Sequence, residues 1–192
     1  MKAPSTSPYP LPGQKIAIIG TTGSGKTTLG DQISQILAIP HIELDALFWQ
    51  PGWVERDRQD FHRVTAQALN IPAWVVDGNY RSVRDLTWGQ ADTLIWLDYP
   101  FLFVFWRLLL RTLQRSITKE ELWNGNVETF DTALFSRDSI MIWLCKSYAR
   151  HRREYPQLIK EPQFAHLQVI HFHRQKDKDA WLERVRLSCH QN

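Results

Sequence analysis

The chain has 192 residues, of which 43% are hydrophobic, and it contains 9 Trp and 9 Phe. A chain of this length and composition can bury the core of one compact domain, which excludes global disorder. The formal net charge of +3, with an isoelectric point near 8.9, suits anionic substrates but is weak evidence for nucleic-acid binding. Cys145 and Cys189 form no metal-ligand pattern and are too few for a disulfide scaffold, which fits a reducing cytosol.

The first thirteen residues are rich in Pro and Ser and lack the apolar core of a signal peptide. We expect residues 1–13 to be a mobile tail and residues 14–192 to form a single domain. The most apolar run, Phe101–Leu110, is short and is interrupted by Arg107, so it is not expected to span a bilayer. The sequence therefore predicts a cytoplasmic protein without a membrane segment, and it gives no indication of the oligomeric state.

The first predicted strand, Lys15–Ile19, leads into Gly20-Thr21-Thr22-Gly23-Ser24-Gly25-Lys26-Thr27. This is the G-x-x-x-x-G-K-[ST] phosphate-binding loop between a strand and a helix. Its glycines allow successive backbone N–H groups to point at an anion, and the helix N-terminus adds partial positive charge. Lys26 is expected to reach the β- and γ-phosphates of ATP, and the Thr27 hydroxyl to bind Mg²⁺. The residues expected to contact the nucleotide are Gly20, Thr22, Gly23, Ser24, Gly25, Lys26, Thr27 and Thr28.

Strands and helices alternate along the rest of the chain. Helical spacing of apolar residues predicts helices over residues 28–39, 55–69, 101–116, 136–154 and 177–187. Short apolar runs predict further strands over residues 41–44, 73–76, 93–97 and 166–172. With the phosphate-binding loop, this alternation predicts a three-layer α/β/α P-loop NTPase fold with a five-stranded parallel sheet.

Three aspartates follow predicted strands, where ligands of parallel sheets bind. Asp77 is the preferred partner of Thr27 for orienting Mg²⁺. Asp98 ranks second for this role, because Pro100 suggests that it caps a loop. Asp45 lies on the expected acceptor side, where it either accepts the proton of an attacking hydroxyl or caps the following helix or turn. His171 and His173 alternate on a strand, but nothing near them in the sequence completes a metal site, so they receive no role.

Arginines cluster on two of the predicted helices. Arg107, Arg111 and Arg115 recur every four residues and share one helical face, and Arg150, Arg152 and Arg153 crowd the end of another helix. Each cluster is either a solvated face or a phosphate-binding set, because guanidinium groups grip phosphate oxygens in pairs. Arg111 and Arg153 are the residues that we expect to contact the transferring phosphate.

The expected acceptor side includes Arg81 and Arg84, which could hold the acceptor. Trp49 and Trp53 occupy a turn-rich segment, where their rings either stack on a base or pack internally. The polar segment over residues 120–128 contains Asn-Gly-Asn, a flexible turn that suits either a closing lid or an ordinary surface loop.

From Lys15 to the C-terminus, the chain resembles the adenylate kinase-like group of P-loop small-molecule kinases. It is similar in particular to bacterial proteins identified as DNA topology modulation proteins. Beyond the phosphate loop, the resemblance rests on Leu44-Asp45 with the following Trp49, on the run from Trp74 to Arg81, and on Arg107 with Arg111.

The resemblance implies an acceptor-side segment at about 45–72 and a small helical lid at about 112–153. It places Arg107 and Arg111 at the lid entrance and Arg107 among the substrate-binding residues. Asn79-Tyr80 departs from the aromatic-proline pair of the family, and the lid lacks a zinc-binding cysteine set.

The sequence thus favours a phosphotransferase that binds ATP and Mg²⁺ and transfers the γ-phosphoryl group to a nucleotide, nucleoside or other small acceptor. The proposed catalytic residues are Lys26, Asp45, Arg111 and Arg153. The alternative is a nucleotide-switched regulatory ATPase that influences DNA topology. Nucleic-acid binding is compatible with the basic charge, but no helix-turn-helix or zinc-finger spacing supports it.

Overall fold

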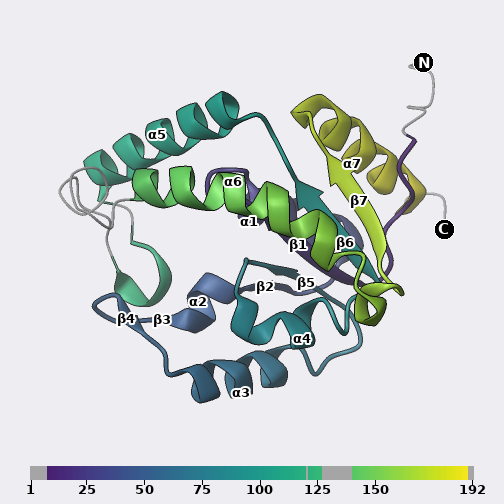
Figure 1. Cartoon of the computed structure of the whole chain (residues 1–192), viewed down its shortest axis with the longest axis horizontal. Helices are drawn as coiled ribbons and strands as arrows, with labels where there is room; N and C mark the ends of the chain where they lie inside the picture. The colour runs from purple at the N-terminus through teal and green to yellow at the C-terminus, as the bar shows by residue number, and fades with distance from the viewer. Residues whose placement is uncertain (1–7, 120, 127–139, 190–192) are drawn as a thin grey trace.

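Figure 1 shows the computed structural model, which describes residues 8–119, 121–126 and 140–189. Its centre is a five-stranded parallel sheet with the strand order β2-β5-β1-β6-β7. The predicted fold class and the number of strands are therefore confirmed. The strands of this sheet are β1 (Lys15–Gly20), β2 (His41–Glu43), β5 (Trp74–Asp77), β6 (Thr93–Leu97) and β7 (Gln168–Phe172).

The helices follow the predicted order with shifted ends. They are α1 (Lys26–Leu37), α2 (Leu44–Phe48), α3 (Arg58–Ala68), α4 (Arg84–Thr87), α5 (Phe101–Thr118), α6 (Ile140–Leu158) and α7 (Gln175–Cys189). Helix α3 begins at Arg58 rather than at Glu55, because the Asp57 side chain accepts hydrogen bonds from the backbone N–H groups of Gln59 and Asp60. Helix α6 continues through Pro156 to Leu158, and the predicted start of this helix, at residues 136–139, lies outside the described part of the chain.

The segment predicted only as aromatic and turn-rich contains regular structure. After the short helix α2, strands β3 (Trp49–Gln50) and β4 (Val54–Glu55) form an antiparallel hairpin. Gly52 and Trp53 turn the chain with φ values of 75° and 58°. Further single turns are η1 (Arg81–Val83), η2 (Trp123–Gly125) and η4 (Pro162–Phe164).

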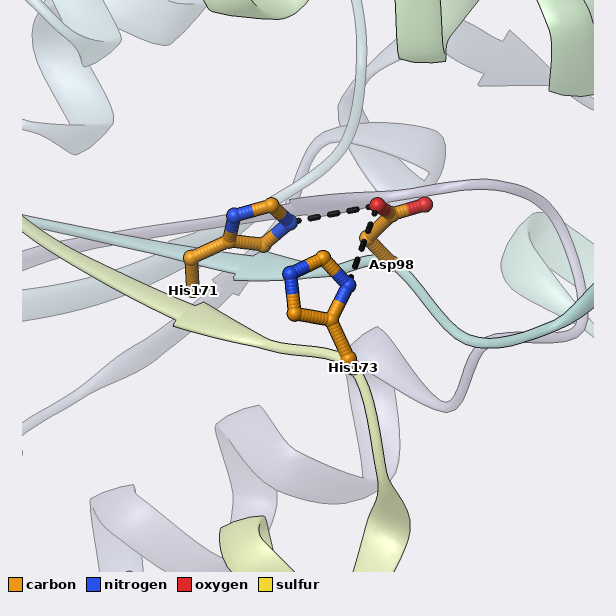
Figure 2. Close-up of side chains that lie close together, drawn as sticks. All are labelled: Asp98, His171 and His173. Carbon is orange, nitrogen blue, oxygen red and sulfur yellow. Dashed lines mark hydrogen bonds and ion pairs between the residues drawn. The ribbon is translucent and has the colours of Figure 1, made fainter.

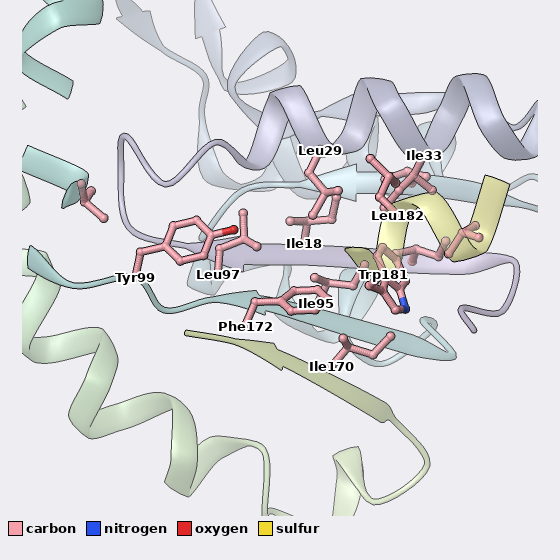
Figure 3. Packing of buried hydrophobic residues seen from close by; sticks show 14 of the residues in the cluster. Ile18, Leu29, Ile33, Ile95, Leu97, Tyr99, Ile170, Phe172, Trp181 and Leu182 are labelled. Carbon is pink, nitrogen blue, oxygen red and sulfur yellow. The ribbon is translucent and has the colours of Figure 1, made fainter. Parts of the chain in front are cut away.

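The hydrophobic core lies on both faces of the sheet. Alternate residues of β1 point in opposite directions, so Ile16 and Ile18 join one cluster while Ala17 and Ile19 join the other. Figure 3 shows part of the first cluster, in which sheet residues pack against α1 and α7. The members labelled in that view are Ile18, Leu29, Ile33, Ile95, Leu97, Tyr99, Ile170, Phe172, Trp181 and Leu182.

The end of the segment expected to be a mobile tail contacts this core, which differs from the prediction. The Tyr9 ring lies 4.6 Å from that of Phe172, and the Pro10 carbonyl accepts a hydrogen bond of 2.7 Å from Trp181 Nε1. Residues 1–7 lie outside the described part of the chain. The tail residues next to the first strand are fixed to the domain, because the Tyr9 ring packs on β7 and the Pro10 carbonyl is hydrogen-bonded to α7.

Helices α5 and α6 lie side by side, and α2, α3 and α4 gather near β2 and β5 (Figure 1). Within the described residues, no helix is both long enough and apolar enough to cross a membrane. The parallel register places Ile18 beside Asp77 and Gly20 beside Leu97. The loop after β1 therefore opens next to the ends of β5 and β6.

Candidate active site

The loop after β1 has a backbone that requires glycine. Gly23 and Gly25 have φ values of 78° and 90°, and Gly25 is the N-cap of α1. A Cβ atom on Gly25 would lie 2.8 Å from Nη2 of Arg107, and one on Gly23 would lie 2.9 Å from Cβ of Leu108. Helix α5 thus packs directly against the loop, and this close approach brings Arg107 to it.

Lys26 and Thr27 lie at the first turn of α1, beside the end of β5. The Lys26 ammonium donates a hydrogen bond of 3.3 Å to the carbonyl of Thr21, and the Thr27 hydroxyl donates one of 3.0 Å to Oδ2 of Asp77. Burial lowers the pKa of Lys26, which the nearby carboxylates of Asp77 and Asp45 oppose. The Thr27 hydroxyl and the Asp77 carboxylate are the oxygen ligands that Mg²⁺ prefers.

His41, which sequence reasoning missed, holds the other oxygen of Asp77. Its Nε2 lies 3.1 Å from Oδ1 of Asp77, and its Nδ1 lies 2.8 Å from Oδ1 of Asp31. Burial lowers the pKa of His41, but the hydrogen bonds to both carboxylates more than offset this, so the net shift is upward. His41 is the first residue of a short strand, and no local pattern sets it apart from other strand residues.

Asn79 ties the phosphate-binding loop to the segment after β5. Its side-chain oxygen accepts a hydrogen bond of 3.3 Å from the N–H of Gly20, and its amide nitrogen donates one of 2.5 Å to the Gly20 carbonyl. This residue belongs to the pair that departs from the pattern of the resembled family. In the sequence, the only sign that Asn79 differs from its neighbours was this departure from the family pattern.

Tyr80, the other residue of that pair, contacts Asp45, the aspartate predicted to lie on the acceptor side. Its hydroxyl donates a hydrogen bond of 2.6 Å to Oδ1 of Asp45. Burial raises the pKa of the Asp45 carboxyl, and this is opposed by the Tyr80 hydrogen bond and by Lys26. The Tyr80 ring packs against Phe48 and Phe61, at centroid distances of 4.7 and 5.0 Å. The Asp45 carboxylate is thus held by a hydroxyl whose own ring is fixed.

A cleft of about 2360 Å³ joins these groups. Ligand pockets usually measure roughly 300–1,000 Å³, so this cleft has room for more than one small molecule. The sequence-predicted residues that line it are Thr22, Gly23, Gly25, Lys26, Thr27, Thr28, Asp45, Trp49, Asp77, Arg81, Arg84, Arg107 and Arg111. The structure therefore brings most of the residues that the sequence predicted to bind the nucleotide and the acceptor into one cleft.

The arginines of α5 and α6 differ in their relation to the cleft. Arg107, Arg111 and Arg115 all line it, as their shared helical face predicts. Arg153, which we expected to contact the transferring phosphate, is exposed and is not among the lining residues, whereas Arg150 on the same helix lines the cleft. Spacing alone did not reveal which face of α6 is turned toward the loop.

The aromatic and cationic groups that the sequence predicted to bind the acceptor are partly fixed by packing. Trp49 and Trp53 line the cleft and meet edge to face, with ring centroids 5.5 Å apart. The Arg84 guanidinium lies over the Trp88 ring at 4.9 Å, and burial lowers its pKa. Arg81 is exposed at the edge of the cleft, where it can meet a charged group of a ligand.

The described part of the predicted lid is bonded to the acceptor-side segment. Asn126, which is 3% exposed, accepts a hydrogen bond of 2.8 Å from the Trp53 N–H and donates one of 3.0 Å to the Gln50 carbonyl. Asn124 donates to the Trp49 carbonyl at 2.5 Å, and Trp123 Nε1 donates to Glu43 at 2.8 Å. We call this segment, residues 121–126, the clasp. Residues 120 and 127–139 of the predicted lid lie outside the described residues.

Asp98, the second candidate for orienting Mg²⁺, lies elsewhere. Its carboxylate contacts His171, His173 and Arg152, as Figure 2 shows for the two histidines, and Asp98 does not line the cleft. Asp77 is therefore the strand-end aspartate that meets Thr27 in this structure. Instead of capping the following loop, the Asp98 side chain contacts residues that are distant in the sequence.

Solved structures share this architecture. Shikimate kinase from Acinetobacter baumannii in complex with shikimate aligns with a TM-score of 0.57 at 16% identity, over 98% of this chain and 99% of that one. A gluconokinase from Sinorhizobium meliloti 1021 aligns with a TM-score of 0.50 at 18% identity, over 94% and 95% of the two chains. Deoxyadenosine kinase from M. mycoides aligns with a TM-score of 0.51 at 14% identity, over 92% and 98%.

The fold is that of P-loop small-molecule kinases. No protein-family model and no curated protein matches the sequence. The comparisons do not show the narrower resemblance to DNA topology modulation proteins. At these low identities the likeness establishes the fold, and the chemistry must be argued from the cleft itself.

Proposed function

We propose that this protein is a kinase that transfers the γ-phosphoryl group of ATP to a hydroxyl group of a small acceptor. One observation carries the proposal. A single cleft is lined both by the glycine-rich loop with Lys26 and Thr27 and by the half-buried Asp45 carboxylate, which lies close enough to Lys26 to oppose the lowering of its pKa. Besides Asp77, which meets Thr27, the site thus has a second, fixed carboxylate that can accept the proton of an attacking hydroxyl group.

The loop and the arginines bind the donor in this proposal. The N–H groups of the loop and the N-terminus of α1 receive the phosphates of ATP, and the Lys26 ammonium leaves the Thr21 carbonyl to bind the β- and γ-phosphates. Arg107 and Arg111 line the same cleft and neutralise charge on the phosphoryl oxygens. The Thr27 hydroxyl and the Asp77 carboxylate fit Mg²⁺, which when bound neutralises charge on the phosphates.

Asp45 acts on the acceptor. As the acceptor oxygen forms its bond to the γ-phosphorus, the bond from that phosphorus to the bridging oxygen of ADP breaks, and Asp45 takes the hydroxyl proton. Oδ1 of Asp45 is occupied by Tyr80, which leaves Oδ2 for the proton. Arg81 and Arg84, at the same end of the cleft, suit an acceptor that carries a negative charge, which includes a nucleotide as well as a hydroxy acid.

The alternative, a nucleotide-switched ATPase that influences DNA topology, has no specific support. Three arginines that could have formed a basic stripe for DNA, Arg107, Arg111 and Arg115, line the cleft instead. A DNA titration at rising salt remains its direct test, because binding to the phosphate backbone weakens steeply with salt.

The test of the proposed function is ATP turnover by the purified full chain with Mg²⁺, measured against a panel of hydroxy acids, nucleosides and nucleotides. We expect at least one acceptor to stimulate ADP release and to appear as its phosphate ester. Lys26→Ala should reduce this turnover by roughly 10²-fold or more, since Lys26 is proposed to bind the transferring phosphoryl group. Lys160→Ala, at an exposed lysine outside the cleft, should leave turnover unchanged.

Steady hydrolysis of ATP that no member of the panel stimulates would contradict a kinase. The position of the acceptor is tested separately by steady-state kinetics. Asp45→Asn should mainly lower kcat if the acceptor is a hydroxyl group, whereas Arg81→Ala should mainly raise the acceptor KM. If Asp45→Asn left kcat intact, the acceptor would not need a base, as for the phosphate of a monophosphate.

A further inference from the structure

Outside the cleft, the carboxyl ends of β6 and β7 bring together one aspartate and two histidines. Oδ2 of Asp98 lies 3.2 Å from Nε2 of His171 and 3.4 Å from Nδ1 of His173 (Figure 2). The three ligand atoms all lie within 4.8 Å of one another. We propose that Asp98, His171 and His173 form a binding site for a divalent transition metal, with Zn²⁺ as the best fit.

The pairing of the two strands explains why these side chains converge. Trp96 is the register partner of His171, and the Asp98 N–H donates a hydrogen bond of 2.9 Å to the Phe172 carbonyl. Because side chains alternate along strands, Phe172 points into the core, while His171 and the following His173 turn to the opposite face with Asp98. The convergence is thus set by strand register.

The distances match a metal site. Zn²⁺ binds imidazole nitrogen and carboxylate oxygen at about 2.0–2.1 Å in tetrahedral geometry, which places neighbouring ligand atoms about 3.3 Å apart. The two distances from a histidine nitrogen to Oδ2 of Asp98, 3.2 and 3.4 Å, fall on either side of this value. Both histidines also approach the same carboxylate oxygen rather than one oxygen each. A single ion beside that oxygen can satisfy all three groups.

The surroundings of the three residues would orient them for an ion. The His171 ring stacks on Trp96 at 3.9 Å with an interplanar angle of 3°, which fixes the direction of its nitrogen atoms. Nε of Arg152 lies 3.0 Å from the other oxygen of Asp98, so that oxygen is occupied and Oδ2 is left for the ion. Such hydrogen bonds to a ligating carboxylate are a regular feature of metal sites.

Other histidine–aspartate contacts in this chain lack this convergence. His41 meets Asp31 and Asp77 through opposite ring nitrogens, so its two carboxylates lie on different sides of the ring. His62 contacts the single carboxylate of Asp85 at 3.0 Å. Within the described residues, the group at Asp98 is the one set of three potential ligands that faces a common point.

The ligand set and its exposure indicate the kind of ion. Two imidazoles and one carboxylate suit Zn²⁺ and disfavour Mg²⁺, which prefers oxygen ligands. The side chains of His171 and His173 are 30% and 58% exposed, so a metal could enter and a water could complete the tetrahedron.

The test uses the full chain without a histidine tag, freed of metal by a chelator and kept without nucleotide. Zn²⁺ is titrated in competition with a chromophoric chelator, and Co²⁺ is added separately to record its visible absorption. We expect one Zn²⁺ per chain and an intense tetrahedral Co²⁺ spectrum. His173→Gln and His171→Gln should each weaken Zn²⁺ binding by about 100-fold or more, which exceeds the usual loss for an outer partner.

His62→Gln is the matched control, because His62 also pairs with an aspartate but has no second histidine beside it. It should bind Zn²⁺ like the wild type. Equal Zn²⁺ affinity in the wild type and in both His171→Gln and His173→Gln would overturn the proposal. An equal loss of affinity in His62→Gln, or a weak octahedral Co²⁺ spectrum in the wild type, would overturn it as well. Circular dichroism of each variant establishes that the chain is folded before affinities are compared.

Discussion

Two carboxylates of the cleft differ in what holds them. Asp77 is bonded on both oxygens, by the Thr27 hydroxyl and by His41, whereas Oδ1 of Asp45 is bonded by Tyr80. A carboxylate fixed by a neighbouring hydroxyl and an imidazole suits the orientation of a cation. Burial raises the pKa of the Asp45 carboxyl toward neutral pH, and a general base works best when its pKa lies near the working pH. The environments of the two residues therefore support the different roles proposed for them.

The Tyr80–Asp45 hydrogen bond is expected to set the pH at which the base becomes active. Burial raises the pKa of Asp45 and the Tyr80 hydroxyl lowers it, so Tyr80→Phe should raise this pKa further. The base must be deprotonated to work, so the acidic limb of the kcat–pH profile should move to higher pH in Tyr80→Phe. Steady-state kinetics from pH 4 to 8 with a saturating acceptor measure this shift.

Tyr148→Phe is the control for this change, because it removes a tyrosine hydroxyl bonded to a backbone carbonyl outside the cleft. Its acidic limb should coincide with that of the wild type. If the limb stayed in place in Tyr80→Phe as well, Asp45 would not be the titrating group.

At the level of single residues, the sequence predicted those that belong to a local pattern. Lys26 and Thr27 follow the glycine-rich loop directly, and Asp77 ends an apolar strand. His41 and Tyr80 contact aspartates 36 and 35 positions away in the sequence. His171 lies 73 positions from Asp98. Without a register for the sheet, no spacing rule could have paired these residues.

Among the elements, the clasp connects the predicted lid to the acceptor side. Its asparagines bind backbone groups of the β3–β4 hairpin, so the hairpin and the clasp hold each other in place. The sequence predicted a flexible turn at Asn-Gly-Asn but not the attachment of this turn to the hairpin. The asparagines bind backbone carbonyls and a backbone N–H group, which are present in almost every residue and leave no pattern in the sequence. The ends of strands were predicted closely where an apolar run stops at a charged residue. The start of α3 was predicted wrongly, because it is set by the N-cap residue Asp57.

Asn126→Ala is expected to loosen the clasp. The substitution removes the hydrogen bonds that Asn126 makes with the Trp53 N–H and the Gln50 carbonyl, and Asn126 is buried, so the cost is about 1–3 kcal/mol for local opening. Exchange of the Trp53 amide hydrogen should accelerate by on the order of tenfold or more. Native-state hydrogen exchange followed by NMR measures this rate.

The control for this prediction is Asn70→Ala, which changes an exposed asparagine outside both the hairpin and the clasp. It should leave the exchange of Trp53 unchanged. Equal protection of Trp53 in Asn126→Ala and the wild type would mean that the clasp does not hold the hairpin.

Across the whole molecule, the parallel sheet gathers its strand ends at one edge, and α5 and α6 bring cationic side chains to that edge. This general arrangement could be predicted from alternating strands and helices, because parallel sheets bind ligands at their carboxyl ends. The strand order and the orientation of α6 could not, since they depend on packing between distant segments. Arg150 rather than Arg153 lines the cleft for this reason.

The cationic cleft has a consequence for the stability of the entire fold. His151 on α6 is 7% exposed, and its ring stacks on Tyr155 at 4.7 Å. Burial lowers the pKa of His151 to about 4, with contributions from the nearby charges of Arg150, Lys26 and Arg84. The imidazole is therefore neutral in the folded chain at neutral pH, where a further positive charge would be unfavourable.

His151 should make the folded state less stable as the pH falls from about 6.5 to 4. The unfolded chain, in which the histidine pKa is about 6.5, binds a proton in this range that the folded chain does not, which costs about 3 kcal/mol at the lower end. His151→Phe keeps a flat ring but cannot bind the proton, so its free energy of unfolding should fall less with pH than that of the wild type. Urea unfolding at a series of pH values, without nucleotide, measures the difference, and His166→Phe, at an exposed histidine, should follow the wild type. If the curves of His151→Phe and the wild type ran parallel, the burial of His151 beside these cations would not lower its pKa in the folded chain.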